Sequence, residues 1–96
     1  MVALHTQGEE IYWHYGTRTP RRSRLMAQVM ADASGYTATA PTGLASHGGF
    51  KDWFIEETGR PGFTLELGRG VNPLPLSDFD AMYEKAREML LLAAFM

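Results

Sequence analysis

The stretch Phe-Thr-Leu-Glu-Leu-Gly, residues 63–68, predicts a short β-strand around which the rest of the chain can be arranged. Apolar and β-branched residues fill it, Pro61-Gly62 precedes it, and Gly68 and Gly70 follow it, so turn-forming residues bound it on both sides. Glu66 stands within this strand. An unpaired buried carboxylate is costly and tends to take up a proton. Glu66 therefore either points to solvent or pairs with an arginine, or it is a catalytic base.

The size and composition of the chain limit what it can be. Its 96 residues make room for one small domain over residues 1–96, and a domain of this size has a thin margin of stability. Hydrophobic residues make up 45% of it, which favours a folded core over disorder. The net charge is −2, with both signs spread along the chain, so we expect no nucleic-acid partner. The absence of cysteine excludes disulfides and thiolate-bound metals.

Membrane and export signals are not evident in the sequence. Residues 1–15 lack the basic and apolar regions of a signal peptide. The longest apolar run, Met89–Met96, is too short to cross a bilayer. We therefore expect no membrane partner. Residues 1–4 already read as a strand, which suggests a piece of something longer.

The residue pattern predicts an α/β fold with a partial mixed sheet of about three strands and three helices. The expected order is strand, strand, helix, helix, strand and helix, at residues 1–6, 11–15, 20–34, 50–57, 63–68 and from 77 onward. We expect the first two strands to form a hairpin. Thr19-Pro20 predicts the start of the first helix and Gly35 its end, Gly59 ends the second helix, and Ser77 caps the third. Residues 36–46 lack periodicity and are predicted to form a loop.

Each predicted helix has a stripe of residues on one side that it should bury. From the first helix to the third, these stripes are Leu25, Met26, Val29, Met30 and Ala33; then Phe50, Trp53, Phe54 and Glu57; then Phe79, Met82, Tyr83, Ala86, Met89, Leu90 and Ala93.

Histidines are the second candidates for chemistry, at His5, His14 and His47. A histidine near a strand end is usually an ordinary hydrogen-bonded side chain. His5 is the best candidate for a ligand because it ends an apolar strand, and the ligands of open α/β sheets collect at strand ends. Glu10 and His14 are interpreted as surface groups. Neither His-Glu-x-x-His nor His-x-x-Glu is present, and His5 alone cannot supply the three protein ligands of a catalytic zinc.

Three segments together resemble a known family. They are Leu4-His5-Thr6-Gln7-Gly8-Glu9 with Ile11-Tyr12-Trp13; Gly49-Phe50-Lys51-Asp52-Trp53-Phe54-Ile55; and Pro61-Gly62-Phe63-Thr64-Leu65-Glu66-Leu67-Gly68 with Asn72-Pro73-Leu74-Pro75. In order and spacing they resemble the closing part of the catalytic domain of zinc carboxypeptidases. Within that superfamily they are most similar to the bacterial γ-D-glutamyl-L-diamino acid endopeptidases, which cut peptidoglycan stem peptides. The resemblance covers nearly the whole chain and implies the C-terminal part of a zinc carboxypeptidase-like fold.

The resemblance implies roles for four residues. His5 matches the last of the three zinc ligands, and Glu66 matches the glutamate that acts as general base. Zinc lowers the pKa of a bound water from about 15.7 to about 7, and a nearby carboxylate can then pass its proton to the leaving amine. His47 stands where the endopeptidases have an aromatic hydroxyl, so it is a candidate catalytic and substrate-binding donor, with a plain loop histidine as the alternative. Tyr36 is a further candidate for substrate binding.

The resemblance also implies parts that this sequence lacks. In the family, a His-x-x-Glu pair of zinc ligands and the arginines that grip substrate precede the matching segment. We therefore expect the isolated chain to bind zinc weakly or not at all and to have no peptidase activity. The alternative is a small α/β interaction module that has lost catalysis. Open sheet edges invite pairing with another copy, so we expect a homo-oligomer. The resemblance implies a bacterial source, with the cytoplasm and the cell wall both left open.

Overall fold

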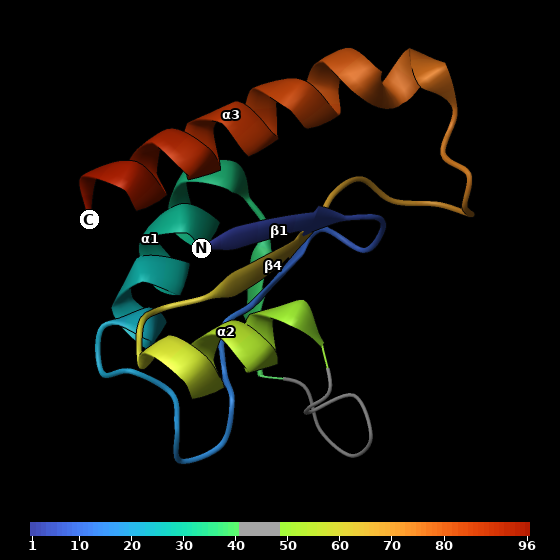
Figure 1. The fold of residues 1–96 in the computed structure, drawn as a ribbon. Helices are drawn as coiled ribbons and strands as arrows, with labels where there is room; N and C mark the ends of the chain where they lie inside the picture. The colour runs from blue at the N-terminus through green and yellow to red at the C-terminus, as the bar shows by residue number, and fades with distance from the viewer. Residues whose placement is uncertain (41–48) are drawn as a thin grey trace.

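A four-stranded mixed sheet with the strand order β1-β4-β2-β3 forms the middle of the molecule. The structure is a computed structural model that describes residues 1–40 and 49–96 (Figure 1). In chain order the elements are β1 (Val2–His5), β2 (Glu10–Tyr12), α1 (Ser23–Ser34), β3 (Thr37–Thr39), α2 (Phe50–Thr58), β4 (Phe63–Glu66), the 3-10 turn η2 (Leu76–Asp78) and α3 (Phe79–Phe95). The predicted α/β class is confirmed. The sheet has one strand more than expected.

Strand β4 occupies a central place in the sheet. It pairs in parallel with β1, so that Val2 lies opposite Phe63, and antiparallel with β2, so that Ile11 lies opposite Leu65. The predicted hairpin of β1 and β2 is therefore wrong. The connection between these two strands passes over the end of β4, where the Gly8 amide donates to the Gly68 carbonyl at 2.7 Å.

The extra strand is β3, which pairs in parallel with β2 at the sheet edge. The sequence predicted a loop over residues 36–46, and this prediction is wrong for Thr37–Thr39. Three residues are too few to show a period, so the strand depends on the ladder that β2 offers to it. The later part of the predicted loop lies outside the described residues.

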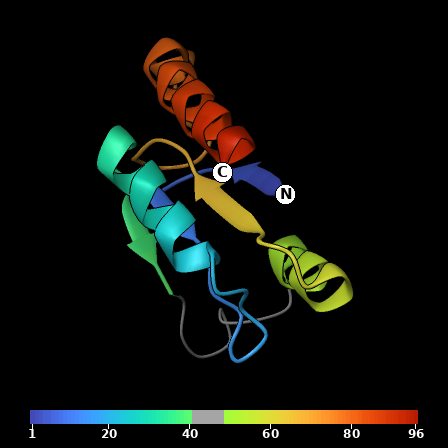
Figure 2. The same ribbon diagram turned by 90° about the vertical axis from the view of Figure 1, so that its left-hand side faces the viewer.

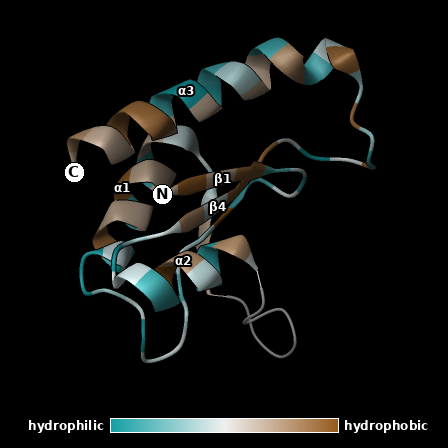
Figure 3. Cartoon of the chain, viewed as in Figure 1, coloured by the Kyte–Doolittle hydropathy of each residue, from teal (hydrophilic) through white to brown (hydrophobic). Residues whose placement is uncertain are grey.

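The helices lie on both sides of the sheet. Figures 1 and 2 show α1 and α3 together on one side, with α2 on the other. Strand β4 alternates between them: Phe63 and Leu65 are buried in the core with α1 and α3, whereas Thr64 and Glu66 are half-buried on the other face. In Figure 3 the apolar residues of β1 form one continuous brown strand beside this core. The alternation of β4 thus turns Glu66 away from the core.

The predicted helix ends agree with the structure better than the predicted starts. Gly35 and Gly59 close α1 and α2 in the left-handed region, with φ values of 80° and 66°, as expected. Helix α1 begins at Ser23 instead of Pro20. The Thr19 hydroxyl, the predicted cap, accepts from the Tyr15 amide at 2.6 Å and donates to the Gly16 carbonyl. Helix α3 begins after a 3-10 turn that contains Ser77, and no side chain caps it.

The predicted buried faces of the helices need correction. In α1, Met26 and Met30 are buried as expected, whereas Leu25 is 69% exposed. In α2, Ile55 is buried, while Phe50 and Trp53 are 60% and 57% exposed.

In α3, Ala86 and Met89 are buried, but the predicted members Phe79, Tyr83 and Leu90 are exposed. Helical spacing marks an apolar side without saying how much of it a neighbouring element covers.

Two further expectations concern the surroundings of the chain. None of the helices in the described ranges combines the length and apolar character that crossing a bilayer requires. Strand β1 lies at an edge of the sheet, where a second copy could pair with it. The homo-oligomer stays a prediction.

Candidate active site at the ends of β1 and β4

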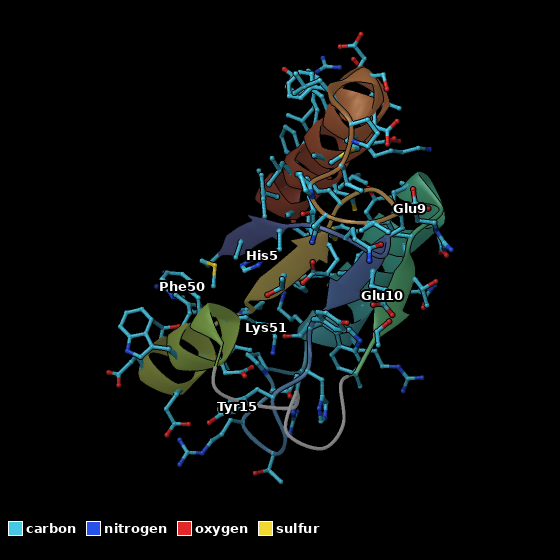
Figure 4. The ribbon with its side chains drawn as sticks, turned by 90° about the vertical axis from the view of Figure 1, so that its right-hand side faces the viewer. His5, Glu9, Glu10, Tyr15, Phe50 and Lys51 are labelled. Carbon is cyan, nitrogen blue, oxygen red and sulfur yellow. The ribbon has the colours of Figure 1, made fainter. Side chains whose placement is uncertain are left out.

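His5 and Glu66 are register partners on the parallel strands β1 and β4. Partners on neighbouring strands point to the same face of a sheet, here the face turned away from α1 and α3. Both residues line one cavity of about 190 Å³, together with Tyr12 and Thr64. In Figure 4, which views the molecule from the right-hand side of Figure 1, the labels of His5 and Glu10 lie on either side of β4. Two candidates sixty-one positions apart by residue number therefore share one cavity.

The backbone holds this pair of residues in place. The Leu67 amide donates to the His5 carbonyl at 2.8 Å, directly after the register pair. At the other end of the two strands, the Phe63 amide donates to the Met1 carbonyl at 3.0 Å. Side chains carried on a paired strand keep their positions better than side chains on a loop.

The N-terminus of α2 forms one wall of the cavity. Residues 49–52 line it. The Lys51 ammonium is buried, forms an ion pair with Asp52 and donates to the His14 carbonyl at 2.7 Å. The Gly49 amide donates to the Asp52 carboxylate at 3.3 Å, which closes the first turn of α2. Lys51 and Asp52 thus neutralise each other and fix the helix beside His5 and Glu66.

Strand β2 brings Glu10 and Tyr12 to the same face. Glu10 lies opposite Glu66, and Tyr12 lies opposite Thr64. The Tyr12 hydroxyl donates to Glu10 Oε2 at 2.8 Å, and the Thr39 hydroxyl donates to Glu10 Oε1 at 3.4 Å.

Glu10, which the sequence analysis interprets as a surface group, is half-buried and lies opposite the candidate base. His14 is also half-buried, and its ring packs in a T-shaped arrangement with that of Trp13, with the ring centroids 5.3 Å apart. The period-two pattern of β2 could have marked Glu10 and Tyr12, but it could not show that Glu66 is their neighbour.

The charges around Glu66 act in opposite directions. Burial raises the pKa of the Glu66 carboxyl above its ordinary value, the positive charge of His5 opposes this, and the Glu10 carboxylate adds to it. The pKa of Tyr12 is raised to about 12. The largest cause is its hydrogen bond to Glu10, followed by burial and by the negative charges of Glu10 and Glu66. Within residues 1–40 and 49–96, no arginine or lysine pairs with Glu66. The alternative of a Glu66–arginine pair is thus not seen in the described ranges.

The chain is similar in sequence to two longer bacterial proteins, one of them named as an endopeptidase. It is 42% identical, over 96 residues, to gamma-D-glutamyl-L-diamino acid endopeptidase 1 of Lysinibacillus sphaericus, a match that covers 100% of this chain and 24% of that protein. It is 40% identical, over 95 residues, to the uncharacterized protein YqgT of Bacillus subtilis (strain 168), covering 99% of this chain and 25% of that protein. The chain thus spans about a quarter of the length of both relatives. No protein-family model matches it.

Tyr36, another candidate residue, does not line this cavity. Tyr36 is 5% exposed in the core on the opposite face, where its hydroxyl accepts from the Gly68 amide at 3.4 Å. It lines a different cavity, beside Glu9 and Arg69. His47 lies outside the described residues. A role in substrate binding stays a prediction for both.

The described residues do not by themselves fit a catalytic zinc. Such a site takes three protein ligands and keeps one open position. In the ranges that the structure describes, no group of three His, Asp or Glu side chains could hold a metal ion. His5 and Glu66 offer one imidazole and one carboxylate.

Proposed function

We propose that the chain is part of the catalytic domain of a zinc carboxypeptidase-type hydrolase that cleaves γ-D-glutamyl-L-diamino acid bonds of peptidoglycan stem peptides. The observation that carries this proposal is the register of His5 with Glu66, whose side chains line one cavity. The 42% identity to an endopeptidase over the whole chain supports it.

In this proposal Glu66 transfers the proton. Its carboxylate takes a proton from water as the water oxygen attacks the amide carbonyl. The carbon–nitrogen bond then breaks, and Glu66 gives the proton to the amine of the leaving diamino acid. A carboxyl with a raised pKa is suited to both halves of this transfer, because it holds the proton more readily than an exposed glutamate.

His5 is the proposed contribution of this chain to a zinc site in the longer protein. Zinc, when bound, supplies a Lewis acid that polarises a carbonyl and lowers the pKa of water. The described residues contain no group of three possible ligands, so His5 would share the metal with ligands from elsewhere in that longer protein. His47 is proposed as a hydrogen-bond donor to substrate, and Tyr36 as a support for the substrate-binding surface.

A chimeric enzyme tests these roles. The matching quarter of the Lysinibacillus sphaericus endopeptidase is replaced by this chain, and release of the diamino acid from a γ-D-glutamyl peptide is measured with zinc present. We expect the chimera to hydrolyse the peptide. We expect Glu66→Gln to lower kcat by about 100-fold or more with a small change in KM, because a positioned acid–base group contributes roughly 10²–10⁴-fold. We expect His5→Ala to lower the zinc content as well.

Matched controls separate these roles from general damage. Glu88→Gln makes the same chemical change on the exposed side of α3 and should leave kcat and zinc content unchanged. The chain alone, given the same peptide and zinc, should show no hydrolysis. A chimera that folds but is inactive, or one that keeps its kcat after Glu66→Gln, contradicts the proposed function.

A further inference from the structure

The hydroxyl of Tyr12 has its proton committed to Glu10. The Tyr12 oxygen lies 2.8 Å from Glu10 Oε2. Because the hydroxyl donates this hydrogen bond, its oxygen can still accept one from another group through its lone pairs. Tyr12 lines the cavity of His5 and Glu66, whereas Glu10 supports it from the neighbouring position two residues back on the same face of β2. The wall at Tyr12 thus presents an acceptor with a negative charge beside it.

Within residues 1–40 and 49–96, the Glu10 carboxylate at this wall forms no salt bridge. The one lysine that lines the cavity, Lys51, is already paired with Asp52 and bonded to the His14 carbonyl. The donors to the Glu10 carboxylate in the described part of the chain are neutral, the hydroxyls of Tyr12 and Thr39. Like charges on opposed positions, such as Glu10 and Glu66, destabilise a sheet. A cation that enters the cavity would relieve this repulsion.

We propose that Tyr12 and Glu10 form the part of the site that selects a diamino acid, with the Tyr12 oxygen accepting a hydrogen bond from the side-chain ammonium and Glu10 supplying the charge behind it. This inference rests on the proposed function. The name of the relative that matches the whole chain fits this ligand, because that protein is an endopeptidase for a bond to a diamino acid. An ordinary α-amino acid in the leaving position has no second amine, so this contact distinguishes the two.

The inference makes Tyr12 a specificity-determining residue and Glu10 a positioning residue. Glu10 acts through Tyr12, because it accepts the hydrogen bond of the Tyr12 hydroxyl and thereby orients the oxygen lone pairs outward. It also lowers the cost of bringing a cation to a half-buried wall. Thr64, which faces Tyr12 across the strands and lines the cavity, adds a hydroxyl that can also accept.

Two probes that differ only at the side-chain nitrogen test this inference on the whole 96-residue chain. They are Nα-acetyl-L-lysine and Nα-acetyl-L-norleucine, in which the acetyl amide stands for the γ-glutamyl amide. Binding is followed by the shifts of backbone amide resonances. We expect acetyl-lysine to bind at least about tenfold more tightly than acetyl-norleucine, with the largest shifts at Tyr12, Thr64 and Glu66.

Variants of the two residues separate charge recognition from structure. Glu10→Gln keeps an acceptor for the Tyr12 hydroxyl and removes the charge, so the lysine preference should fall below about threefold while norleucine binding stays the same. A merely structural role would weaken both probes equally. Glu88→Gln is the matched control and should keep the full preference. If Glu10→Gln does not fold, Tyr12→Phe, which removes only the hydroxyl, must abolish the preference instead.

Three outcomes overturn the inference: equal binding of the two probes, absence of acetyl-lysine binding, or a preference that survives Glu10→Gln and Tyr12→Phe. Its failure is distinguishable from failure of the proposed function, because the binding test needs neither zinc nor hydrolysis. A lysine preference together with an inactive chimera would retain the cation site and reject the peptidase. An active chimera without the lysine preference would support the peptidase and reject the cation site.

Discussion

His5 and Glu66 lie at the same level on two parallel strands, and the amide that follows Glu66 donates to the carbonyl of His5 at 2.8 Å. The ladder that holds the sheet together therefore also sets the relative position of the two candidate side chains. A shift of one residue between β1 and β4 would turn one of them into the core. The pairing of β1 with β4 therefore also brings the two candidate side chains together.

Replacing the candidate base should stabilise the chain. Glu66 is half-buried opposite Glu10, and no lysine or arginine in the described ranges pairs with it. We expect Glu66→Gln to raise the free energy of unfolding by several tenths of a kcal/mol, up to about 1 kcal/mol, in neutral buffer, because a like-charge pair on opposed strands is removed. Urea denaturation measures this, with Glu88→Gln as the neutral comparison. A loss of stability in Glu66→Gln would mean that the carboxylate has a partner that compensates its charge.

Truncating a side chain on the buried side of α2 should cost much more stability than truncating one on its exposed side. Ile55 is 1% exposed, so Ile55→Ala should cost about 2–5 kcal/mol of unfolding free energy through lost burial and the cavity left behind. Trp53 is larger but 57% exposed, so Trp53→Ala should change stability by no more than about 0.5 kcal/mol. Chemical denaturation of both variants checks this. Equal losses would show that the aromatic side of α2 is covered in solution, by a second copy or by another segment.

Two glycines with similar backbones should differ in their tolerance of alanine. Gly35 and Gly68 have φ values of 80° and 73°, which strain any other residue. Around Gly35 a Cβ would meet open space, so Gly35→Ala should cost about 1–2 kcal/mol. At Gly68 a Cβ would lie 2.6 Å from Leu74 Cδ1 and 2.9 Å from Met82 Sδ, so Gly68→Ala should cost more.

Thermal or urea unfolding of the two glycine variants ranks them. Equal stability of Gly35→Ala and Gly68→Ala would mean that the Leu74 and Met82 side chains move aside at little cost.

The ionisation of Tyr12 should make stability depend on pH in the alkaline range. Its pKa is raised from 10.0 to about 12, so the unfolded chain releases this proton before the folded chain does. The stabilisation is therefore complete below pH 10 and is lost as pH rises towards about 12. The ultraviolet absorbance of tyrosinate, compared between the native chain and Tyr12→Phe, isolates this group. Glu10→Gln should lower the pKa, since the hydrogen bond to Glu10 is its largest cause.

An unchanged alkaline unfolding curve in Tyr12→Phe would contradict this prediction, because the variant lacks the group that releases the proton late. The experiment also reports whether the Tyr12 hydroxyl donates its hydrogen bond to Glu10. If Tyr12 did not donate to Glu10, Glu10→Gln would leave the tyrosinate titration almost unchanged.

Local sequence determined most of the elements and the C-terminal ends of the first two helices. The apolar strand with turn residues on both sides predicted β4, and the glycines predicted the ends of α1 and α2, because backbone conformation depends on the residue itself. The sequence also singled out His5 and Glu66, one for its place at a strand end and the other as a carboxylate within an apolar strand. Their roles stay predictions.

Only the tertiary structure decided which elements became neighbours. It inserted β4 between β1 and β2, added β3 through the ladder of β2, and left Phe50, Trp53 and Tyr83 exposed. It also brought Glu10 and Tyr12 of β2 to Glu66 of β4. Pairing between strands far apart in the chain is set by the burial of the whole sheet, and no local pattern of residues contains that information.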